Sequence, residues 1–330
     1  MAPKVSVVII VHDRVQFIQE AIDSVLVSAS NPLEYEVIVV KYANNNSINS
    51  ILANNPVRVI SCDEISPAEK LISGINASRG EIILFLEDDD VFLPGKADRI
   101  KNLFLDDPEL SYVHNEYVTI NENGLELHKP NSLVSNVIIR NENHDIHVRA
   151  LAHILRKNLF FNLSCCSIRK EKISPFLDVL RKAPFSLDLA IFLLSVESGG
   201  KLLFPVGSLT GYRRHNSYSY DTSSLESFIK ITIRTDQEYL KNLEDMKGFF
   251  STRQITDVID SYIDRYEATQ LVISEGFQSM KKIRAALNLL YISMATGLTH
   301  FVKISLILLI SAISPSFAIR LLYRYRQYSV

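Results

Sequence analysis

The strongest constraint on this chain is a short apolar segment that runs directly into four acidic residues. Residues 82–86, with the sequence IILFL, are followed without a break by Glu87, Asp88, Asp89 and Asp90. A continuous apolar run of this length predicts a strand that is covered on both faces, as in parallel sheets. The acids then lie at the carboxyl end of the strand, where open α/β sheets bind their ligands.

Neighbouring carboxylates at one strand end repel one another unless a cation or solvent neutralises them. A divalent ion suits this position, because Mg²⁺ typically takes one or two carboxylates together with substrate phosphate oxygens. The alternative is a solvated acidic turn without a ligand, and the surrounding sequence has to decide between the two.

The residues before the acids alternate between strand and helix patterns. Strands are indicated by β-branched or apolar runs and helices by 3.6-residue spacing, in the order strand 5–11, helix 15–27, strand 35–40, strand 57–60 and a helix from 66 to the glycine at 80. This order predicts a parallel sheet with right-handed crossovers. The loops at 12–14, 41–46 and 87–90 then open on one edge, with neither a dinucleotide fingerprint nor a P-loop among them.

Composition narrows the class of protein. The chain has 330 residues, of which 47% are hydrophobic and 22% charged, with a net charge of −2. These values indicate a globular protein and argue against a disordered or nucleic-acid-binding one. The cysteines, Cys62, Cys165 and Cys166, form no disulfide framework, so we expect reduced thiols in the cytosol. The apolar run 5–11 is too short for a signal peptide.

Three segments carry a family resemblance. Residues 5–14 (VSVVIIVHDR), 36–40 (EVIVV) and 74–90 (GINASRGEIILFLEDDD) resemble the opening strand, second strand and D-x-D stretch of family-two glycosyltransferases. The resemblance covers roughly residues 4–220 and is more specific than any single motif. It implies an α/β fold of the GT-A type, with a mostly parallel sheet flanked by helices. It also implies a nucleotide-sugar donor and a divalent metal, Mg²⁺ or Mn²⁺.

The resemblance assigns roles to individual acids. Asp88 matches a ribose or sugar contact and Asp89 a metal ligand, with Asp90 beside it adding charge to the metal site. Glu87 stands where the family usually has its first Asp. The end of the first strand adds Val11, Asp13 and Arg14 as donor-binding residues.

The second strand departs from the family pattern. It ends in Lys41-Tyr42-Ala43-Asn44, whereas the family has an acid there that reads the base of the donor. A lysine cannot accept a hydrogen bond from a base N–H. Either Asp13 or an asparagine of the turn replaces that acid, or backbone groups read the base, or the donor is unusual. Lys41 is a donor-binding candidate because it could face a phosphate instead.

The catalytic base is expected at Asp188. Residues 162–169 resemble the strand that precedes the acceptor helix of the family, and the Asp of the family's Glu-Asp pair falls at Asp188, with Leu187 in place of the Glu. Ser186 could cap this helix, and the field of the helix N-terminus predicts a lowered pKa for Asp188. An ionised carboxylate there could take the proton of an acceptor hydroxyl.

A basic segment follows the apolar run 202–209. Residues 211–219 (GYRRHNSYS) resemble a family motif, which makes His215 a metal or diphosphate contact and Arg213 or Arg214 a charge partner. Both arginines are donor-binding candidates. The alternative is a solvated basic loop. Residues 131–150 are polar and predict a loop over the site, and His144 and His147 lack a third ligand for zinc. His114 alone is more typical of a structural histidine.

The last hundred residues differ from the rest. Apolar stripes predict helices at 225–250 and 252–275, and residues 276–330 contain seven Lys or Arg and no acid. The apolar pieces after residue 281 are each shorter than the ~20 residues that a spanning helix needs. We therefore expect 281–330 to bind a membrane surface. One kinked span or a helical oligomerisation domain are the alternatives.

Together these patterns predict three parts: a glycosyltransferase domain at 1–222, a helical extension at 223–280 and membrane-binding helices at 281–330. The predicted function is inverting, metal-dependent sugar transfer to a glycan or lipid-linked acceptor. We expect it on the cytoplasmic face of the cell membrane, with no nucleic-acid partner. The rival hypothesis is a non-catalytic relative that binds sugar nucleotides or serves as a scaffold, which the residues Lys41 and Leu187 motivate.

Overall fold

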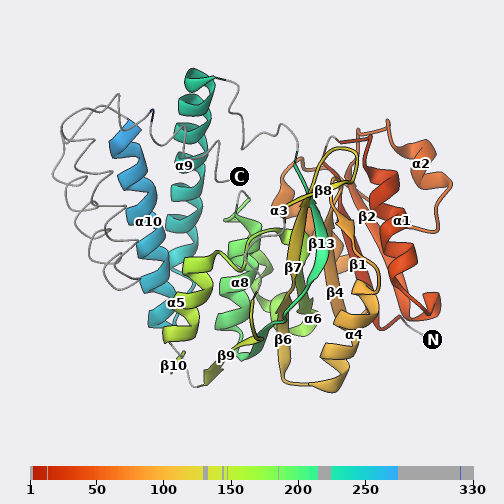
Figure 1. The fold of residues 1–330 in the computed structure, drawn as a ribbon, viewed down its shortest axis with the longest axis horizontal. Helices are drawn as coiled ribbons and strands as arrows, with labels where there is room; N and C mark the ends of the chain where they lie inside the picture. The colour runs from red at the N-terminus through yellow and green to blue at the C-terminus, as the bar shows by residue number, and fades with distance from the viewer. Residues whose placement is uncertain are drawn as a thin grey trace. The chain divides into compact units, whose positions relative to one another are not determined.

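The computed structural model describes residues 3–12, 14–128, 133–142, 145–146, 148–184, 186–214, 224–273 and 320. The chain divides into two compact units, Met1–His215 and Asn216–Val330. The first unit is an α/β structure, and the described part of the second consists mainly of two helices, α9 (Leu225–Lys247) and α10 (Arg253–Ile273) (Figure 1).

A nine-stranded sheet forms the centre of the first unit, in the order β10-β9-β12-β6-β11-β4-β1-β2-β3. Neighbours β3-β2-β1-β4 are all parallel, β6 and β12 are parallel to each other, and β11 runs antiparallel to both β4 and β6. The strands are β1 (Val5–Ile10), β2 (Tyr35–Tyr42), β3 (Arg58–Cys62), β4 (Ile82–Glu87), β6 (Leu110–His114), β9 (Val137–Glu142), β10 (Asp145–Ile146), β11 (Cys166–Arg169) and β12 (Gly200–Phe204).

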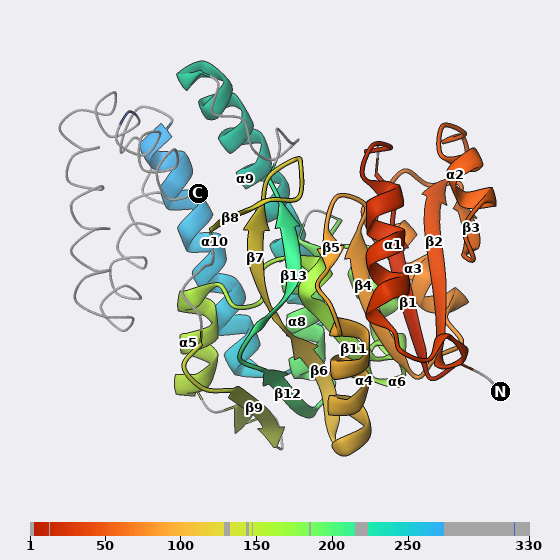
Figure 2. The same cartoon turned by 45° about the vertical axis from the view of Figure 1, so that its right-hand side comes forward.

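Strand β1 is buried on both faces because helices cover each of them. Its side chains at Val5, Val7 and Ile9 share a core with α1 (Ile18–Ser28) and α4 (Lys96–Asp106). On the other face, α3 (Pro67–Ala77) approaches so closely that a Cβ on Gly74 would lie 2.3 Å from Cγ1 of Val8. Figure 2 shows β1, β2 and β4 side by side. This two-sided cover is what the β-branched run at 5–11 predicts.

A second, four-stranded sheet begins where the acids end. Its order is β5-β13-β7-β8, with β5 (Val91–Phe92), β13 (Ser208–Arg213), β7 (Glu116–Ile120) and β8 (Glu126–His128). Because β4 ends at Glu87 and β5 starts at Val91, the three aspartates occupy the junction between the two sheets. The topology therefore brings the loop after β1, near residue 12, and the end of β13, at residue 213, to the same short acidic turn.

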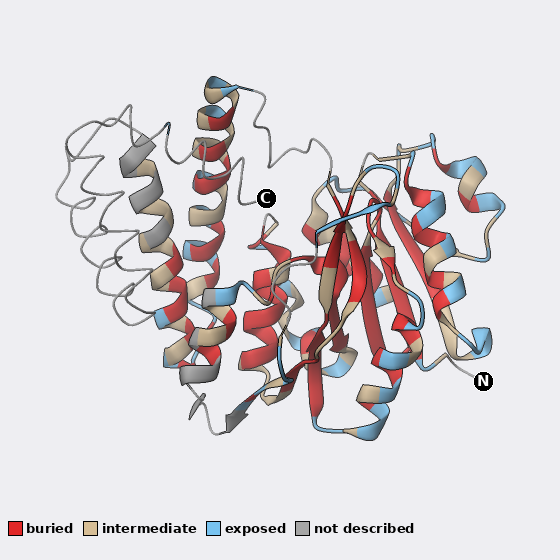
Figure 3. Cartoon of the chain, in the orientation of Figure 1, coloured by how far each residue is buried: buried red, intermediate tan, exposed pale blue. Residues whose placement is uncertain are grey.

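Helix α8 (Leu187–Glu197) is the most buried helix of the first unit, and Figure 3 shows it red along most of its length. Phe192 packs on Tyr112 of β6, with ring centroids 6.0 Å apart. The remaining helices and 3-10 turns are α2 (Asn49–Ala53), α5 (Val148–Lys157), α6 (Lys170–Ile173), α7 (Leu177–Leu180), η1 (Pro32–Glu34), η2 (Leu163–Cys165) and η3 (Ser174–Phe176).

The segment 131–150 is not the polar loop that its composition predicts. Of its described residues, 133–136 are irregular and the others form β9, β10 and the start of α5. Strand β9 pairs with β12 from Val137 to Asn141, with Ile139 buried and Ile138 exposed. Pairing of β9 with β12, an apolar strand distant in sequence, outweighed the local polarity of this segment. The conformation of a short segment commonly depends in this way on the strand that it pairs with.

The second unit contains α9 (Leu225–Lys247) and α10 (Arg253–Ile273), close to the helices that the apolar stripes predict. They pack on each other, and Tyr239 stacks on Tyr266 with centroids 5.3 Å apart. Within the described ranges, no helix combines the length and the apolar character needed to cross a membrane. The predicted membrane-binding segment 281–330 lies outside the described residues apart from Arg320.

Candidate functional site

Residues Asp88, Asp89 and Asp90 form the turn after β4, which we call the aspartate turn. Asp88 is fully buried against the loop after β1. Oδ2 of Asp88 accepts the backbone N–H of His12 at 2.8 Å and that of Arg14 at 3.4 Å. Its Oδ1 lies 3.4 Å from Nη1 of Arg14. Asp88 therefore fastens the carboxyl ends of β1 and β4 together, as the predicted common edge requires.

Asp89 is the most accessible of the three aspartates. Its side chain is 10% exposed, and its Oδ2 lies 3.0 Å from Nη1 of Arg14, so that one guanidinium group faces both Asp88 and Asp89. Oε1 of Glu87 lies 3.6 Å from Nε2 of His12. These carboxylates raise the pKa of Arg14, opposing the effect of its burial, and keep the guanidinium charged.

Asp90 faces the protein interior. Its Oδ1 accepts the backbone N–H of Arg213 at 2.8 Å, and its Oδ2 accepts Nδ2 of Asn162 at 2.9 Å. Burial raises the pKa of Asp90 well above its ordinary value, and the negative charges of Asp89 and Glu87 act in the same direction. Asp90 thus joins β4 to β13 and to the turn that precedes β11.

Asp188 lies in the first turn of α8 and is half-buried. Its Oδ2 accepts the backbone N–H of Asn162 at 3.1 Å, and its Oδ1 accepts that of Leu189 at 2.8 Å. Asn162 therefore donates to both Asp90 and Asp188, and links the aspartate turn to the first turn of α8.

Two expectations about the start of α8 are wrong. Burial raises the pKa of Asp188, and the backbone N–H groups that lower it do not offset this effect. The field of a helix N-terminus is small compared with the loss of water around a carboxylate. Ser186 occupies the N-cap position but makes no side-chain capping bond.

Lys41 turns back onto its own loop and faces neither open solvent nor the aspartates. Its Nζ lies 2.9 Å from the carbonyl oxygen of Asn45, 3.3 Å from that of Ala43 and 3.5 Å from that of Tyr42. Nδ2 of Asn45 in turn donates to the carbonyl of His12 at 3.4 Å. The lysine organises the turn after β2 and, through Asn45, links it to the loop after β1.

A second buried lysine, Lys70, lies next to the end of β1. Nζ of Lys70, on α3, donates to the carbonyl oxygen of Val11 at 2.7 Å, and Val11 is itself buried. Together, Arg14, Lys41 and Lys70 bring positive charge to the loops after β1 and β2. The aspartates after β4 bring the opposite charge to the same edge.

Arg213 is enclosed by protein. Its guanidinium donates to the backbone carbonyls of Asp89, Asn121 and Glu122, at 2.7, 3.0 and 2.8 Å, and to Oε2 of Glu20 at 2.6 Å. Its side chain has no exposed surface. The structure thus gives Arg213 the contacts of a buried structural arginine. Its neighbour Arg214 is half-buried.

Some predicted residues lie outside the described residues: the donor-binding candidate Asp13, the metal candidate His215, and the pair His144 and His147. In the part of the chain that is described, no group of three or more His, Cys, Asp or Glu side chains has the geometry of a metal site. Among the described acids after β4, Glu87 and Asp89 have exposed side-chain surface, 29% and 10%, and Asp89 is the one that the family resemblance assigns to a cation. That fits an ion such as Mg²⁺ or Mn²⁺, which takes much of its coordination shell from substrate oxygens and water.

Sequence reasoning missed three residues that build the site: Asn162, Lys70 and Lys96. Nζ of Lys96 is buried and donates to the carbonyl of Ser164 at 2.5 Å and to Oγ1 of Thr210 at 2.7 Å. Burial lowers the pKa of Lys96 to about 8. The position of Lys70 among apolar helix residues could have indicated a buried lysine. No local sequence pattern indicates the role of Asn162, because its partners are distant in sequence.

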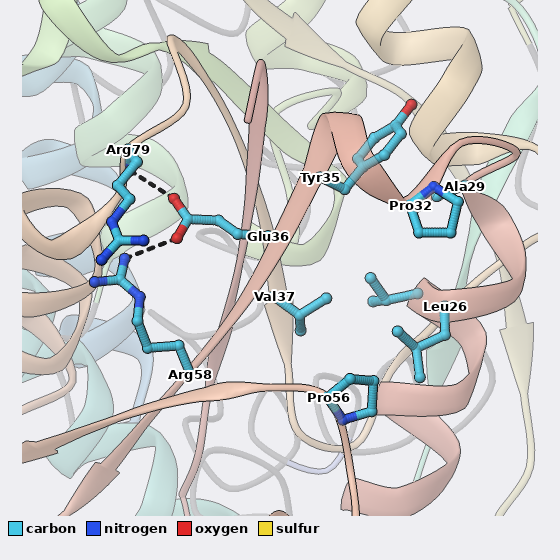
Figure 4. A pocket seen from close by; sticks show the side chains of 10 residues that line it. Leu26, Ala29, Pro32, Tyr35, Glu36, Val37, Pro56, Arg58 and Arg79 are labelled. Atoms are coloured by element: carbon cyan, nitrogen blue, oxygen red, sulfur yellow. Dashed lines mark hydrogen bonds and ion pairs between the residues drawn. The ribbon is translucent and has the colours of Figure 1, made fainter. Parts of the chain in front are cut away.

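A pocket of about 470 Å³ lies at the other edge of the sheet (Figure 4). Apolar residues of α1 and β2 line it, and Glu36 beside them accepts the N–H of Arg79 at 2.6 Å and Nη2 of Arg58 at 2.8 Å. Because Tyr35 and Arg58 begin β2 and β3, this pocket lies at the amino ends of the strands. It is separate from the aspartate turn.

A family model described as "Glycosyl transferase family 2" matches residues 6–177. A protein of Rickettsia felis named "Uncharacterized glycosyltransferase" is 29% identical over 125 residues, which is 37% of this chain and 20% of that protein. A protein of the same name from Rickettsia bellii is 29% identical over 133 residues, or 39% of this chain and 19% of that protein. The match thus covers about a fifth of these relatives.

Solved structures of S. aureus TarS resemble the whole chain. The crystal structure of its residues 1–349 in complex with UDP-GlcNAc has a TM-score of 0.57 and 13% identity, and the match covers 99% of this chain and 92% of that one. The complex of the same region with UDP has a TM-score of 0.55 and 12% identity, with the same coverage. At such identities the similarity shows the fold alone.

Proposed function

The chain belongs to glycosyltransferase family 2 and has a GT-A-like α/β fold, and from this premise we propose that it is an inverting, metal-dependent enzyme that transfers a sugar from a nucleotide-diphosphate donor to a hydroxyl acceptor. One observation carries the proposal: Asn162 donates to Asp90 and to Asp188. This shared partner supports the proposal that the aspartate turn and the base act on one substrate.

The donor side consists of the loops after β1, β2 and β4. Arg14 and the loops held by Lys41 and Lys70 supply cationic and backbone groups, which suit a diphosphate. We keep Val11, Asp13 and Arg214 as donor contacts. TarS, which shares the fold, was crystallised with UDP-GlcNAc and with UDP, so UDP-sugars are the first donors to test.

The metal side rests on Asp89, with His215 and Asp90 as further candidates. Asp89 offers hard oxygen donors and is the most exposed of the three aspartates, whereas Asp90 is buried. A bound Mg²⁺ or Mn²⁺ would supply charge stabilisation to the leaving diphosphate. Arg14 would orient Asp89, and Arg213 would hold the backbone of the turn in place from inside.

The proposed base is Asp188. Its raised pKa makes it a better proton acceptor than an ordinary aspartate, which suits removal of a proton from an acceptor hydroxyl. Attack opposite the leaving diphosphate would invert the anomeric centre. We propose a glycan or lipid-linked acceptor at the cytoplasmic face of the cell membrane, reached through residues 281–330 with their excess of basic residues.

A calorimetric titration tests the donor assignment, and a transfer assay tests the chemistry. The full chain is titrated with a panel of UDP-, GDP- and dTDP-sugars, with and without Mn²⁺, and release of the nucleoside diphosphate is then followed for each donor that binds. Metal-dependent binding with turnover supports the enzyme. Metal-dependent binding without hydrolysis or transfer for any donor would favour the non-catalytic relative.

A further inference from the structure

The residue that joins the two halves of the site is Asn162, and each of its polar side-chain groups is used. Its Nδ2 donates to Asp90 and its Oδ1 accepts the N–H of Ser164 at 2.7 Å. Its backbone N–H donates to Asp188. The residue is 3% exposed, so these bonds are largely shielded from water.

The backbone of Asn162 has an unfavourable conformation for a residue with a side chain. Its φ is 80° and its ψ 115°, a region that glycine occupies far more readily. A glycine at this position would relieve that strain, so retaining a side chain here implies that the side chain is needed. Backbone strain of this kind concentrates at functional sites.

The turn that carries Asn162 is also anchored by groups on either side of it. Nε2 of His114 lies 2.9 Å from the carbonyl of Phe161, and Lys96 donates to the carbonyl of Ser164. Oγ of Ser164 accepts the N–H of Glu87 at 2.9 Å. The turn is thus fixed to β4, β6 and α4 by bonds that do not involve the side chain of Asn162.

We propose that Asn162 is a positioning residue that sets the carboxylate of Asp188 relative to the aspartate turn, through its paired hydrogen bonds to Asp90 and Asp188. This inference rests on the proposed function. Asn162 contacts neither donor nor acceptor in this role; it fixes the distance between the base and the diphosphate site, and a small displacement of a reacting group slows a reaction strongly.

The first test compares two glycine variants of the full chain. Asn162→Gly keeps the backbone N–H and suits the conformation, but removes the bond to Asp90. Asn158→Gly is the matched control, because Asn158 lies in the same segment with a φ of 52° and an exposed side chain. We expect Asn162→Gly to lower kcat about 10- to 100-fold, with donor KM within about threefold of the wild type. Asn158→Gly should leave both unchanged.

The second test reverses the polarity of one bond. Asn162→Asp keeps the acceptor for Ser164 but sets a carboxylate against Asp90, so it should lower both kcat and Tm. The double variant Asn162→Asp/Asp90→Asn restores one amide–carboxylate bond with its donor and acceptor exchanged. We expect it to recover at least half of the Tm lost in the single variant Asn162→Asp, and to raise kcat above that of Asn162→Asp at least tenfold.

The outcomes separate this inference from the proposed function. Wild-type turnover together with an unchanged kcat in Asn162→Gly would overturn the positioning role and leave the enzyme assignment intact. A double variant whose loss of Tm equals the sum of the two single losses would also overturn it, and this readout needs no activity. Absence of wild-type turnover with Tm recovery in the double variant would remove the enzyme assignment and retain the coupling of Asn162 to Asp90.

Discussion

Nη1 of Arg14, in the loop after β1, lies 3.0 Å from Oδ2 of Asp89, in the turn after the neighbouring parallel strand β4. The same nitrogen lies 3.4 Å from Oδ1 of the buried Asp88. Arg14 is therefore a built-in counter-ion for the aspartate turn. It lowers the repulsion that neighbouring carboxylates would otherwise suffer, and the side chain of Asp89 remains 10% exposed.

The Asp89→Asn variant tests the metal assignment. We expect it to abolish the Mn²⁺-dependent part of donor binding and to lower transfer by about 10²-fold or more, because metal charge stabilisation is worth several kcal/mol. The measurement is calorimetry with and without Mn²⁺. Asp178→Asn, which removes an 86% exposed acid, is the control. Equal Mn²⁺ dependence in Asp89→Asn and wild type would remove Asp89 from the metal site.

The Asp188→Asn variant tests the base. The amide keeps the shape and an acceptor for the N–H of Asn162 but cannot take a proton, so transfer should fall about 10²- to 10⁴-fold. Donor affinity and the far-UV spectrum should stay at their wild-type values, since the group faces the acceptor in this mechanism. Near-normal turnover would mean that another group accepts the proton.

The Lys41→Met variant tests the role of the turn after β2. Three carbonyl groups share the ammonium group in the wild type, and the thioether cannot donate to them. We expect donor KM to rise about tenfold with a smaller change in kcat, and the free energy of unfolding to fall by about 1–3 kcal/mol. Lys157→Met, at an exposed position, is the control. A fall in kcat at constant KM would contradict this assignment.

His114 gives the protein a defined acid sensitivity. Burial lowers the pKa of His114 to about 3 from an ordinary value of 6.5, so the unfolded chain binds a proton between these pH values and the folded chain does not. Stability from this group is therefore complete above pH 6.5 and is lost as the pH falls towards 3, by up to about 1.4 kcal/mol per pH unit.

The variant His114→Gln isolates this effect, since glutamine does not titrate and can still donate to the carbonyl of Phe161. Urea unfolding of both proteins from pH 7.5 to 4.5 gives the difference. We expect the wild type to lose stability relative to the variant below pH 6.5. Parallel curves over this range would show that His114 is not held neutral in the folded protein.

Gly80 tests the packing between the amino ends of β1 and β4, at the end of the strands opposite to the aspartate turn. A Cβ at this position would lie 2.6 Å from the backbone nitrogen of Ser6 and 2.7 Å from the carbonyl carbon of Val5, both in the central strand. Because backbone atoms cannot move aside cheaply, Gly80→Ala should lower the free energy of unfolding by about 1–3 kcal/mol. Gly248→Ala, where the Cβ would meet nothing within 4 Å, is the matched control in thermal unfolding.

The position of the acids in the fold could be predicted from the amino-acid pattern alone. The apolar runs at 5–11 and 82–86 predict strands that are buried on both faces, as in parallel sheets. The carboxyl ends of such strands lie at one edge of the sheet. Together with the alternation of strands and helices, this was enough to predict the α/β sheet and to bring the loop at Arg14 to Asp88 and Asp89. Family membership followed from the same segments.

The partners of each charged side chain, in contrast, depend on how the chain folds. Asn162 is 72 residues from Asp90 and 26 from Asp188 along the chain, and no periodicity in the sequence connects them. Arg213 and Lys41 belong to motifs that suggest phosphate contacts, yet backbone carbonyls enclose both cations. Burial and hydrogen-bond partners depend on which distant segments meet in the fold. Local residue types can therefore predict which edge of the sheet carries the charged side chains, but not which groups those side chains face.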